Sequence, residues 1–434
     1  MRRRDFLKQL SKAAGVTSIA SFLPWSTSLR AEPYTGPFYV TIAAQGGWDV
    51  SSFCDPKENS GGQIINHWSS DGGTVQTLTN SAIRNAPFAD NSRFFQKYRD
   101  YMLVVNGIDA QTNAHDAGVR HNWSGQLAAG YPSFNAIAST IYGNELPLAF
   151  ISNGGYKETA GLTTYTLLQD PSTLQSLVNS NRTPAGDNRY FYQDELDIVY
   201  RYQQERLERL LAEPTLLPKT RRHMNQLLQA RVDKSLLENL AAVLPTDLVD
   251  STDKDGHYNP LLQQAQMSLA AYQSGLCVCA DMILDGFDSH DDHDARHVVD
   301  LTRLTNGIDY LWDSAEALGI ADRLVVFITS DFSRTPYYND GNGKDHWPIG
   351  SAIFMKKNAD WGNRVIGATD NLQNAQALNP FTLQVDTSTQ GIQLYPAHIQ
   401  QALRALAGIH EHEIATQFPL NADLLDMFNP ALGT

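Results

Sequence analysis

The sequence predicts an α/β fold, a three-layer α/β/α sandwich built on a mostly parallel sheet. Apolar, β-branched runs bounded by turn residues recur at 38–43, 102–106, 147–152, 276–284, 324–329 and 351–355. Both faces of these runs are apolar, as expected of strands buried between two layers. Helical patterns lie between them, for instance at 295–318, and another at 396–406 follows the last run. Strands that alternate with helices indicate a parallel sheet covered on both sides.

The domain organisation is inferred from the chain length and from the absence of linkers and repeats. A chain of 434 residues could hold two or three domains by length alone. It has no Pro- or Ser-rich linker, internal repeat or low-complexity block, so we expect one large domain at 32–434. At about 194–244 the pattern changes to a long helical stretch with breaks at Pro214 and Pro218. We predict a helical insertion there, whose role is a lid, an oligomer contact or, most simply, packing.

The N-terminus has the pattern of an export signal. Arg2-Arg3-Arg4-Asp5-Phe6-Leu7-Lys8 precedes a short apolar stretch and small residues up to Ala31. This order is typical of a twin-arginine signal peptide, which we predict at 1–31, and its apolar run is too short to cross a bilayer. An amphipathic first helix is the alternative. We expect the twin-arginine translocase as a partner and a periplasmic or secreted location. Because this route carries folded proteins, a metal could be loaded before export.

The composition is acidic, with a formal net charge of −14. Removing the predicted leader takes away six basic residues and one acidic residue, which leaves −19. Such a body lacks the basic face that nucleic acid requires, and it has no electrostatic attraction to anionic lipid. No second apolar segment approaches the ~18 residues of a transmembrane helix, so we expect no membrane span in the mature protein.

The chain has three cysteines, Cys54, Cys277 and Cys279. Three thiols cannot build a disulfide framework for a domain of this size. Cys277 and Cys279 alternate along a predicted strand, and such a pair rarely has the geometry of a bridge. We therefore expect buried free thiols in a core strand.

Asp and His residues lie next to several predicted strands. The candidate metal ligands are Asp49, Asp288, His290, Asp331 and His346, and His115 lies after the second strand. Since ligands of parallel sheets bind beyond the carboxyl ends of the strands, these side chains should meet at one edge. Carboxylates and imidazoles are ligands that zinc, manganese and iron accept. The i, i+2 spacing of Asp288 and His290 places both donors on the same side of an extended chain.

Each candidate also has a simpler alternative role. Asp49 could cap a helix or stabilise a turn, Asp331 could be a turn residue, and His115 could be a packed histidine. His290 could be a solvated histidine in a charged loop, and we expect the run 291–294 after it to be such a solvated loop, capping the helix from Ala295. Arg334 could pair with a carboxylate instead of contacting a substrate. Taken together, the candidates favour a metal site over these separate roles, because chance rarely places Asp or His after so many strands of one chain.

Five segments match motifs of a known family. Residues 330–336, Ser-Asp-Phe-Ser-Arg-Thr-Pro, with 345–347, Asp-His-Trp, are similar to its Ser-Glu-Phe-Gly-Arg-Thr-Pro and Gly-x-Asp-His segments. Residues 286–290, Gly-Phe-Asp-Ser-His, are similar to its Gly-Trp-Asp-Thr-His, and 46–49, Gly-Gly-Trp-Asp, to its Gly-Gly-x-Asp. The loop 113–115, Asn-Ala-His, resembles its second-strand loop. At these residues the chain resembles domain of unknown function 1501, regarded as an exported branch of the alkaline-phosphatase and sulfatase superfamily.

The resemblance implies a role for each candidate. Asp288, His290 and His346 map onto one metal position, and Asp49 with Asp331 maps onto a second. In that superfamily two metals clamp a phosphate or sulfate ester while a Ser, Thr or formylglycine attacks. The candidate catalytic residues are accordingly Thr112, His115 and Arg334, with Thr112 a positional choice of nucleophile and Ser52 a weaker one.

The chain departs from the superfamily pattern at Phe332, which stands where those enzymes carry an Asp-His pair. The second metal is thereby short of a ligand, so we expect at least one tightly held divalent ion. Zinc is the first choice, with manganese, iron, magnesium and calcium as alternatives. Asp49 and Asp331 would complete a weaker site or orient the ligands of the first.

Two classes of function remain open from the sequence. The first is an exported metal-dependent hydrolase of phosphate or sulfate esters, whose substrate is a small anionic ester or an envelope polymer. The second is a non-catalytic, metal-stabilised binding or assembly protein of the cell envelope, because a fold by itself does not fix a function.

Overall fold

The computed structural model describes residues 33–167, 181, 189–218, 220–221, 224–225, 244–245 and 247–433. Residues Pro33–Thr434 form one compact unit. The predicted signal peptide at 1–31 lies outside the described residues, as does much of the predicted helical insertion. Within that insertion the structure contains α7 (Gln193–Leu211), which follows the predicted helical pattern and ends shortly before Pro214.

The core of the unit is an eight-stranded sheet with the order β12-β4-β11-β8-β1-β7-β5-β6. The strands are β1 (Phe38–Gln45), β4 (Met102–Asp109), β5 (Phe150–Ser152), β6 (Thr166–Leu167), β7 (Cys279–Asp285), β8 (Leu324–Thr329), β11 (Ile349–Lys356) and β12 (Arg364–Ile366). β11 pairs antiparallel with β4 and β8, and the other neighbours in this sheet pair in parallel. The predicted mostly parallel sheet is confirmed.

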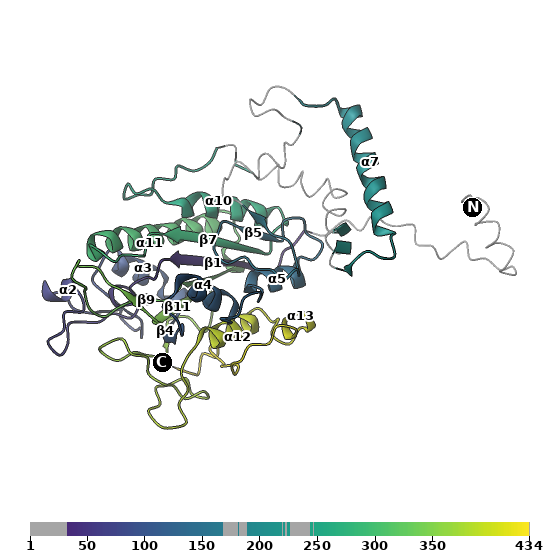
Figure 1. Ribbon diagram of the computed structural model, residues 1–434. Coiled ribbons are helices and arrows are strands. Elements are labelled where there is room, and N and C mark those ends of the chain that lie inside the picture. The colour runs from purple at the N-terminus through teal and green to yellow at the C-terminus, as the bar shows by residue number, and fades with distance from the viewer. Residues whose placement is uncertain are drawn as a thin grey trace, which may run out of the picture. The chain divides into compact units, whose positions relative to one another are not determined.

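Helices cover both faces of this sheet, as Figure 1 shows. α10 (Pro260–Gln273) and α11 (His293–Ala317) lie on one face. α4 (His115–Ser124), α5 (Phe134–Tyr142) and α12 (Pro396–Leu406) lie on the other. The remaining named helices are the short α2 (His67–Ser70) and α13 (Glu413–Thr416) and the eight-residue α3 (Asn91–Tyr98). The three layers match the fold class that the sequence predicts.

The sequence explains where these elements begin and what they bury. Asn259 caps α10 by accepting a hydrogen bond from the Leu261 N–H at 3.2 Å, and Pro260 occupies the first helical position, where no N–H is needed. Side chains on both faces of the central strands are buried, for example the adjacent Tyr39 and Val40 on β1, which point to opposite faces. The three cysteines are buried and free, as predicted, but only Cys279 lies in a strand, because Cys277 precedes β7 and Cys54 follows β1.

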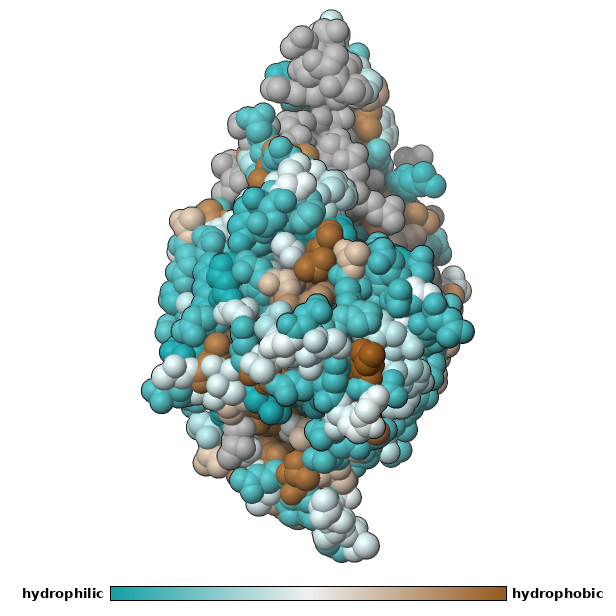
Figure 2. Space-filling view, turned by 90° about the vertical axis from the view of Figure 1, so that its left-hand side faces the viewer, coloured by the Kyte–Doolittle hydropathy of each residue, from teal (hydrophilic) through white to brown (hydrophobic). Residues whose placement is uncertain are grey.

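The parallel strands end at a common edge, and this edge places the functional loops. β1 and β7 point toward the side of Figure 1 where α2 lies. Figure 2 faces this side, and its coloured residues are mostly hydrophilic with scattered apolar ones. A small antiparallel pair, β9 (Ser333–Arg334) and β10 (His346–Trp347), follows β8 and brings Arg334 opposite His346. Another small pair is β2 (Gln76–Thr77) with β3 (Arg84–Asn85). None of the helices in the described part of the chain combines the length and hydrophobicity of a membrane span.

Candidate metal centre

Four side chains from three loops converge at the carboxyl edge of the sheet. Asp288 and His290 follow β7, His346 lies in β10, and His115 is the first residue of α4, which follows β4. Asp288 Oδ1 lies 3.1 Å from Nε2 of His290, 3.4 Å from Nε2 of His346 and 3.6 Å from Nε2 of His115. All four side chains are partly exposed. The three residues assigned to the first metal position therefore meet, and His115 joins them.

The loop between β9 and β10 is held in place by Asn339. Its Oδ1 accepts hydrogen bonds from the N–H groups of Gly341 and Gly343, and its Nδ2 donates to the carbonyl of His290 at 2.9 Å. A Cβ atom at Gly343 would lie 1.8 Å from that same carbonyl oxygen, so this close approach requires glycine. Asn339 thus ties the loop that ends in His346 to the loop that carries His290.

The second ring nitrogen of each histidine contacts a hydrogen-bond acceptor. The contacts are His115 Nδ1 to Asp331 Oδ2 at 2.6 Å, His290 Nδ1 to Asp345 Oδ1 at 2.8 Å, and His346 Nδ1 to the Asn113 carbonyl at 2.7 Å. Carbonyl oxygens and ionised carboxylates only accept, so each Nδ1 carries a proton and donates it. In neutral imidazoles the three Nε2 atoms then direct lone pairs toward Asp288.

A divalent cation fits this geometry. Nε2 of His290 and Nε2 of His346 are 2.9 Å apart, and two lone pairs at that distance repel unless a proton or a cation lies between them. Nε2 of His115 is buried and has no hydrogen-bond partner among the described residues. One ligand atom from each of His115, Asp288 and His346 lies within 4.8 Å of the others. Neutral histidines whose Nδ1–H is held by an acceptor are the usual form of metal-binding histidine.

The protonation preferences differ between two of the histidines. Burial lowers the pKa of His346, and the nearby charge of Arg334 lowers it further against the opposing bond to Asn113, so this side chain favours the neutral form that binds metal. The hydrogen bond to Asp331 raises the pKa of His115. Protons therefore compete with a metal ion more strongly at His115 than at His346.

Arg334 lies behind Asp288 and not at the open face of the cluster. Its guanidinium is fully buried and donates to Asp288 Oδ1 at 2.6 Å, to the Gly47 carbonyl at 2.8 Å and to the Gly46 carbonyl. Burial would raise the pKa of Asp288, but Arg334 and the nearby histidines hold it below its ordinary value. The structure therefore shows the carboxylate pairing that was the alternative to substrate contact.

Asp331 orients His115 from a buried position. Its carboxylate accepts from the Gly46 N–H at 3.1 and 3.3 Å as well as from His115 Nδ1. The Asp331 carboxylate contacts Nδ1 of His115, whereas Nε2 of His115 is directed at the cluster. Of the two roles predicted for Asp331, these contacts favour orientation of a ligand.

A sequence profile described as "Protein of unknown function (DUF1501)" matches residues 40–387. The chain belongs to the DUF1501 family. The match includes the five motif segments described above and every member of the cluster. No curated protein matches the chain.

Several solved structures are similar to this DUF1501 chain. One is alkaline phosphatase from the Antarctic bacterium TAB5, with 8% identity, a TM-score of 0.31, and coverage of 74% of this chain and 91% of that one. Another is BT1596, a 2-O GAG sulfatase, with 10% identity, a TM-score of 0.34, and coverage of 88% and 73%. A third is a protein of the alkaline phosphatase superfamily from Vibrio parahaemolyticus, with 10% identity, a TM-score of 0.33, and coverage of 87% and 68%.

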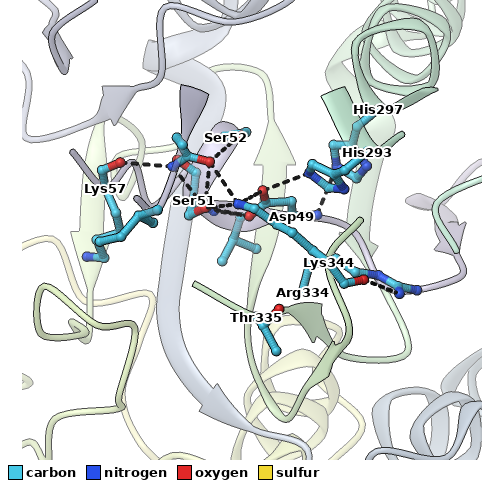
Figure 3. Close-up of polar contacts among 12 residues, drawn as sticks. Asp49, Ser51, Ser52, Lys57, His293, His297, Arg334, Thr335 and Lys344 are labelled. Carbon is cyan, nitrogen blue, oxygen red and sulfur yellow. Dashed lines mark hydrogen bonds and ion pairs between the residues drawn. The ribbon is translucent and has the colours of Figure 1, made fainter. Parts of the chain in front are cut away.

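Asp49 does not join the cluster but lies in a separate buried network, drawn in Figure 3. Its Oδ2 is 2.7 Å from Lys344 Nζ and 3.0 Å from His293 Nε2, and its Oδ1 accepts from the N–H and hydroxyl of Ser51. Asp49, His293 and Lys344 are fully buried. Burial would raise the pKa of Asp49, but Lys344 and the hydrogen bond from His293 hold it well below its ordinary value. An ammonium group thus occupies the position at which a second ion would contact Asp49.

The sequence interpretation missed Lys344 and misplaced His293. The charged run after His290 was expected to be solvated, yet His293 is buried, begins α11 and stacks on His297. The residue before the helix is Asp292, whose side chain makes no capping hydrogen bond, so the prediction of a cap in this run is wrong. The i, i+4 spacing of His293 and His297 on one helix face was the available signal.

The positions of Thr112, the candidate nucleophile, and of Phe332 affect what chemistry the cluster can perform. The Thr112 hydroxyl accepts a hydrogen bond from the Ala114 N–H at 3.1 Å, and the structure records no contact between it and the cluster within the described chain. The buried ring of Phe332 lies 4.8 Å from the ring of His115 and 4.6 Å from that of His346. Phe332 is thus an apolar support for two imidazoles.

Proposed function

We propose that this DUF1501 chain is a metal-dependent hydrolase of phosphate or sulfate esters with one divalent ion per chain. The observation that carries the proposal is the convergence of three Nε2 lone pairs and one carboxylate oxygen in a partly exposed cluster. Three imidazoles and one carboxylate favour zinc, manganese or iron over magnesium and calcium, which prefer sets of oxygen ligands.

Each of the chain's own residues has a defined task in this proposal. His115, His290, His346 and Asp288 hold the ion, and Arg334 fixes Asp288 from behind. Asp331, Asp345 and the Asn113 carbonyl hold the Nδ1 protons, which keeps the Nε2 atoms free to bind. A bound divalent ion supplies polarisation of the ester oxygens and activation of water. Because Thr112 is turned toward the backbone, attack by water is favoured over attack by this hydroxyl.

The second candidate function is a metal-stabilised binding or assembly protein without turnover. The observation that favours it is Phe332, whose ring fills the space beside the histidines where further ligands would stand in the superfamily pattern. Metal binding belongs to both candidates, so only turnover separates them.

The test measures metal per chain by elemental analysis and hydrolysis of p-nitrophenyl phosphate and p-nitrophenyl sulfate. The variants are His346→Ala and, as a control, His257→Ala, which changes a histidine outside the cluster. The hydrolase predicts about one ion per chain and turnover of an ester, both lost in His346→Ala and retained in His257→Ala. Bound metal without turnover of either ester would favour the binding protein. A metal-free parent protein would overturn both candidates.

We also propose that residues 1–31 direct the folded chain through the twin-arginine translocase to the periplasm or the exterior. The adjacent Arg3 and Arg4 ahead of Phe6 support this proposal. Replacing both arginines by lysine should leave the precursor in the cytoplasm, measured by cell fractionation. Unchanged export of that variant would refute the twin-arginine route.

A further inference from the structure

A cavity lies near the carboxyl edge of the sheet, and none of its lining residues belongs to the metal cluster. Its volume is about 510 Å³, within the usual range of small-molecule sites. The floor includes Asp55, in the loop after β1, and Asn106 of β4. The rim includes Arg84 of β3, and the segment that follows β12 closes one wall with Thr369.

The acidic group of this cavity is already neutralised. Asp55 is buried, and its Oδ1 accepts from Lys57 Nζ at 2.9 Å while its Oδ2 accepts from the Thr369 hydroxyl. A buried carboxylate in such a pair has no uncompensated charge with which to attract a cation. The carboxylate also does not repel an anion strongly, because the ammonium of Lys57 is adjacent.

Two side chains that line the cavity have hydrogen-bond donors without a recorded acceptor among the described residues. Arg84 is exposed, and in the described part of the chain its guanidinium has neither an ion pair nor a hydrogen bond. Asn106 is buried, and its Oδ1 accepts from the Ser351 hydroxyl at 2.8 Å, which leaves its Nδ2 donors without a recorded acceptor among the described residues. Both of these groups are donors, and one of them is a permanent cation in a chain whose net charge is −14.

Part of the wall between these donors is apolar. Pro56, Val365, Leu383 and Val385 line the cavity together with the backbone of Gly367 and Ala368. A guanidinium binds carboxylate, sulfate and phosphate through paired N–H donors, and flat apolar walls bury the body of an organic ligand. A small organic molecule with one oxyanion group combines both requirements.

We propose that this cavity binds a small organic oxyanion, with the anionic group on Arg84 and Asn106 and the carbon body against Val365 and Leu383. A bare inorganic ion would leave the apolar walls in contact with water. A neutral molecule would leave the charge of Arg84 unused. The site is independent of the metal centre and does not require that the chain be an enzyme.

The experiment titrates benzoate, benzenesulfonate and phenylphosphonate into the protein by isothermal calorimetry, with benzamide as the uncharged counterpart. None of these probes is an ester, so hydrolysis does not interfere. The titrations are repeated with His346→Ala, which removes binding of the anions to a metal. We expect at least one anion to bind both proteins with a Kd of millimolar or tighter, and at least about tenfold tighter than benzamide.

Three variants locate the site. Arg84→Gln should weaken binding by about tenfold or more, and Ala82→Trp, which fills the mouth without changing charge, should weaken it as well. Arg206→Gln changes an exposed arginine on α7 and should leave binding unchanged. The proposal is overturned if no anion binds, if benzamide binds as tightly, or if binding survives both cavity variants. Anion binding that is lost only in His346→Ala would assign it to the metal centre instead.

Discussion

The buried pair of Lys344 and Asp49 provides the sharpest test of how the metal-binding loop is held. Lys344 immediately precedes Asp345 and His346, and its ammonium reaches back to Asp49 at the end of β1. Replacing Lys344 by Met keeps the length and apolar stem of the side chain but removes the charge. The Asp49 carboxylate then remains fully buried without its cation.

The expected cost follows from what remains around Asp49. Removing one partner of a buried ion pair costs about 3–5 kcal/mol of unfolding free energy. Asp49 keeps three hydrogen-bond donors, two from Ser51 and one from His293, so we expect a loss near the lower end, about 3 kcal/mol. The double variant with Asp49→Asn has no buried charge and should recover most of this loss.

The loss should also depend on pH. Burial lowers the pKa of His293 despite its bond to Asp49, and the charge of Lys344 lowers it further. Without Lys344, a protonated His293 can neutralise Asp49, so the folded-state pKa of His293 rises. A raised folded-state pKa contributes stability that is present at low pH and lost as pH increases. The deficit of Lys344→Met should therefore be at least about 1 kcal/mol smaller at pH 5.5 than at pH 8.

The assay is urea denaturation followed by circular dichroism at both pH values. Lys357→Met is the matched control, because Lys357 pairs with Glu316 in a partly exposed pair, and exposed ion pairs contribute little to stability. Metal affinity measured on folded Lys344→Met should fall, since the loop that carries His346 loses its anchor. If Lys344→Met costs no more than Lys357→Met, or if its deficit is equal at both pH values, the reasoning fails.

Three further predictions concern the sheet and the cluster. Burial raises the pKa of Asp281 to about 7, above its unfolded value of 3.8, so its contribution to stability is lost as pH rises through that window. Asp281→Asn should remove a decline of about 3 kcal/mol between pH 5 and pH 8, and parallel curves for the two proteins would refute this. Asp345→Asn should weaken metal binding about 10- to 100-fold without changing the ligands, because it holds His290 Nδ1. An unchanged affinity would show that Asp345 is not needed for orientation. Gly47→Ala should destabilise the fold by about 1 kcal/mol or more, because Gly47 has φ +84° and its Cβ would lie 2.9 Å from the Phe332 ring. Unchanged stability in thermal unfolding would contradict it.

Much of the fold could be predicted from the sequence because each long strand of the sheet is apolar on both faces. That pattern marks burial but not strand direction, so it could not show that β11 runs antiparallel between β4 and β8. The start of β7 was also misplaced. The apolar run begins at 276, whereas the strand begins at Cys279, because hydrophobicity alone does not separate a strand from the buried turn before it.

The candidate site was predictable where ligands follow strands and unpredictable where partners are distant in sequence. Asp288, His290 and His346 meet as the motif suggests. His115 joins them only because α4 begins at the same edge, and its role depends on Asp331, which lies 216 residues away. Lys344 has the sequence context of a solvated loop, and its burial follows from the contact with Asp49 across 295 residues.

The charges at this edge are balanced pair by pair, and this balance determines where an ion can bind. Lys344 neutralises Asp49, Lys57 neutralises Asp55, and Arg334 contacts Asp288. A second ion beside Asp49 would have to displace a fully buried ammonium from its carboxylate, which costs several kcal/mol. At the histidine cluster the reverse holds. Three imidazole lone pairs face one another there, and the Asp288 carboxylate beside them is partly exposed. Lys344 thus excludes a metal ion from the position near Asp49. A bound cation would instead lower the electrostatic energy at the cluster of His115, His290 and His346.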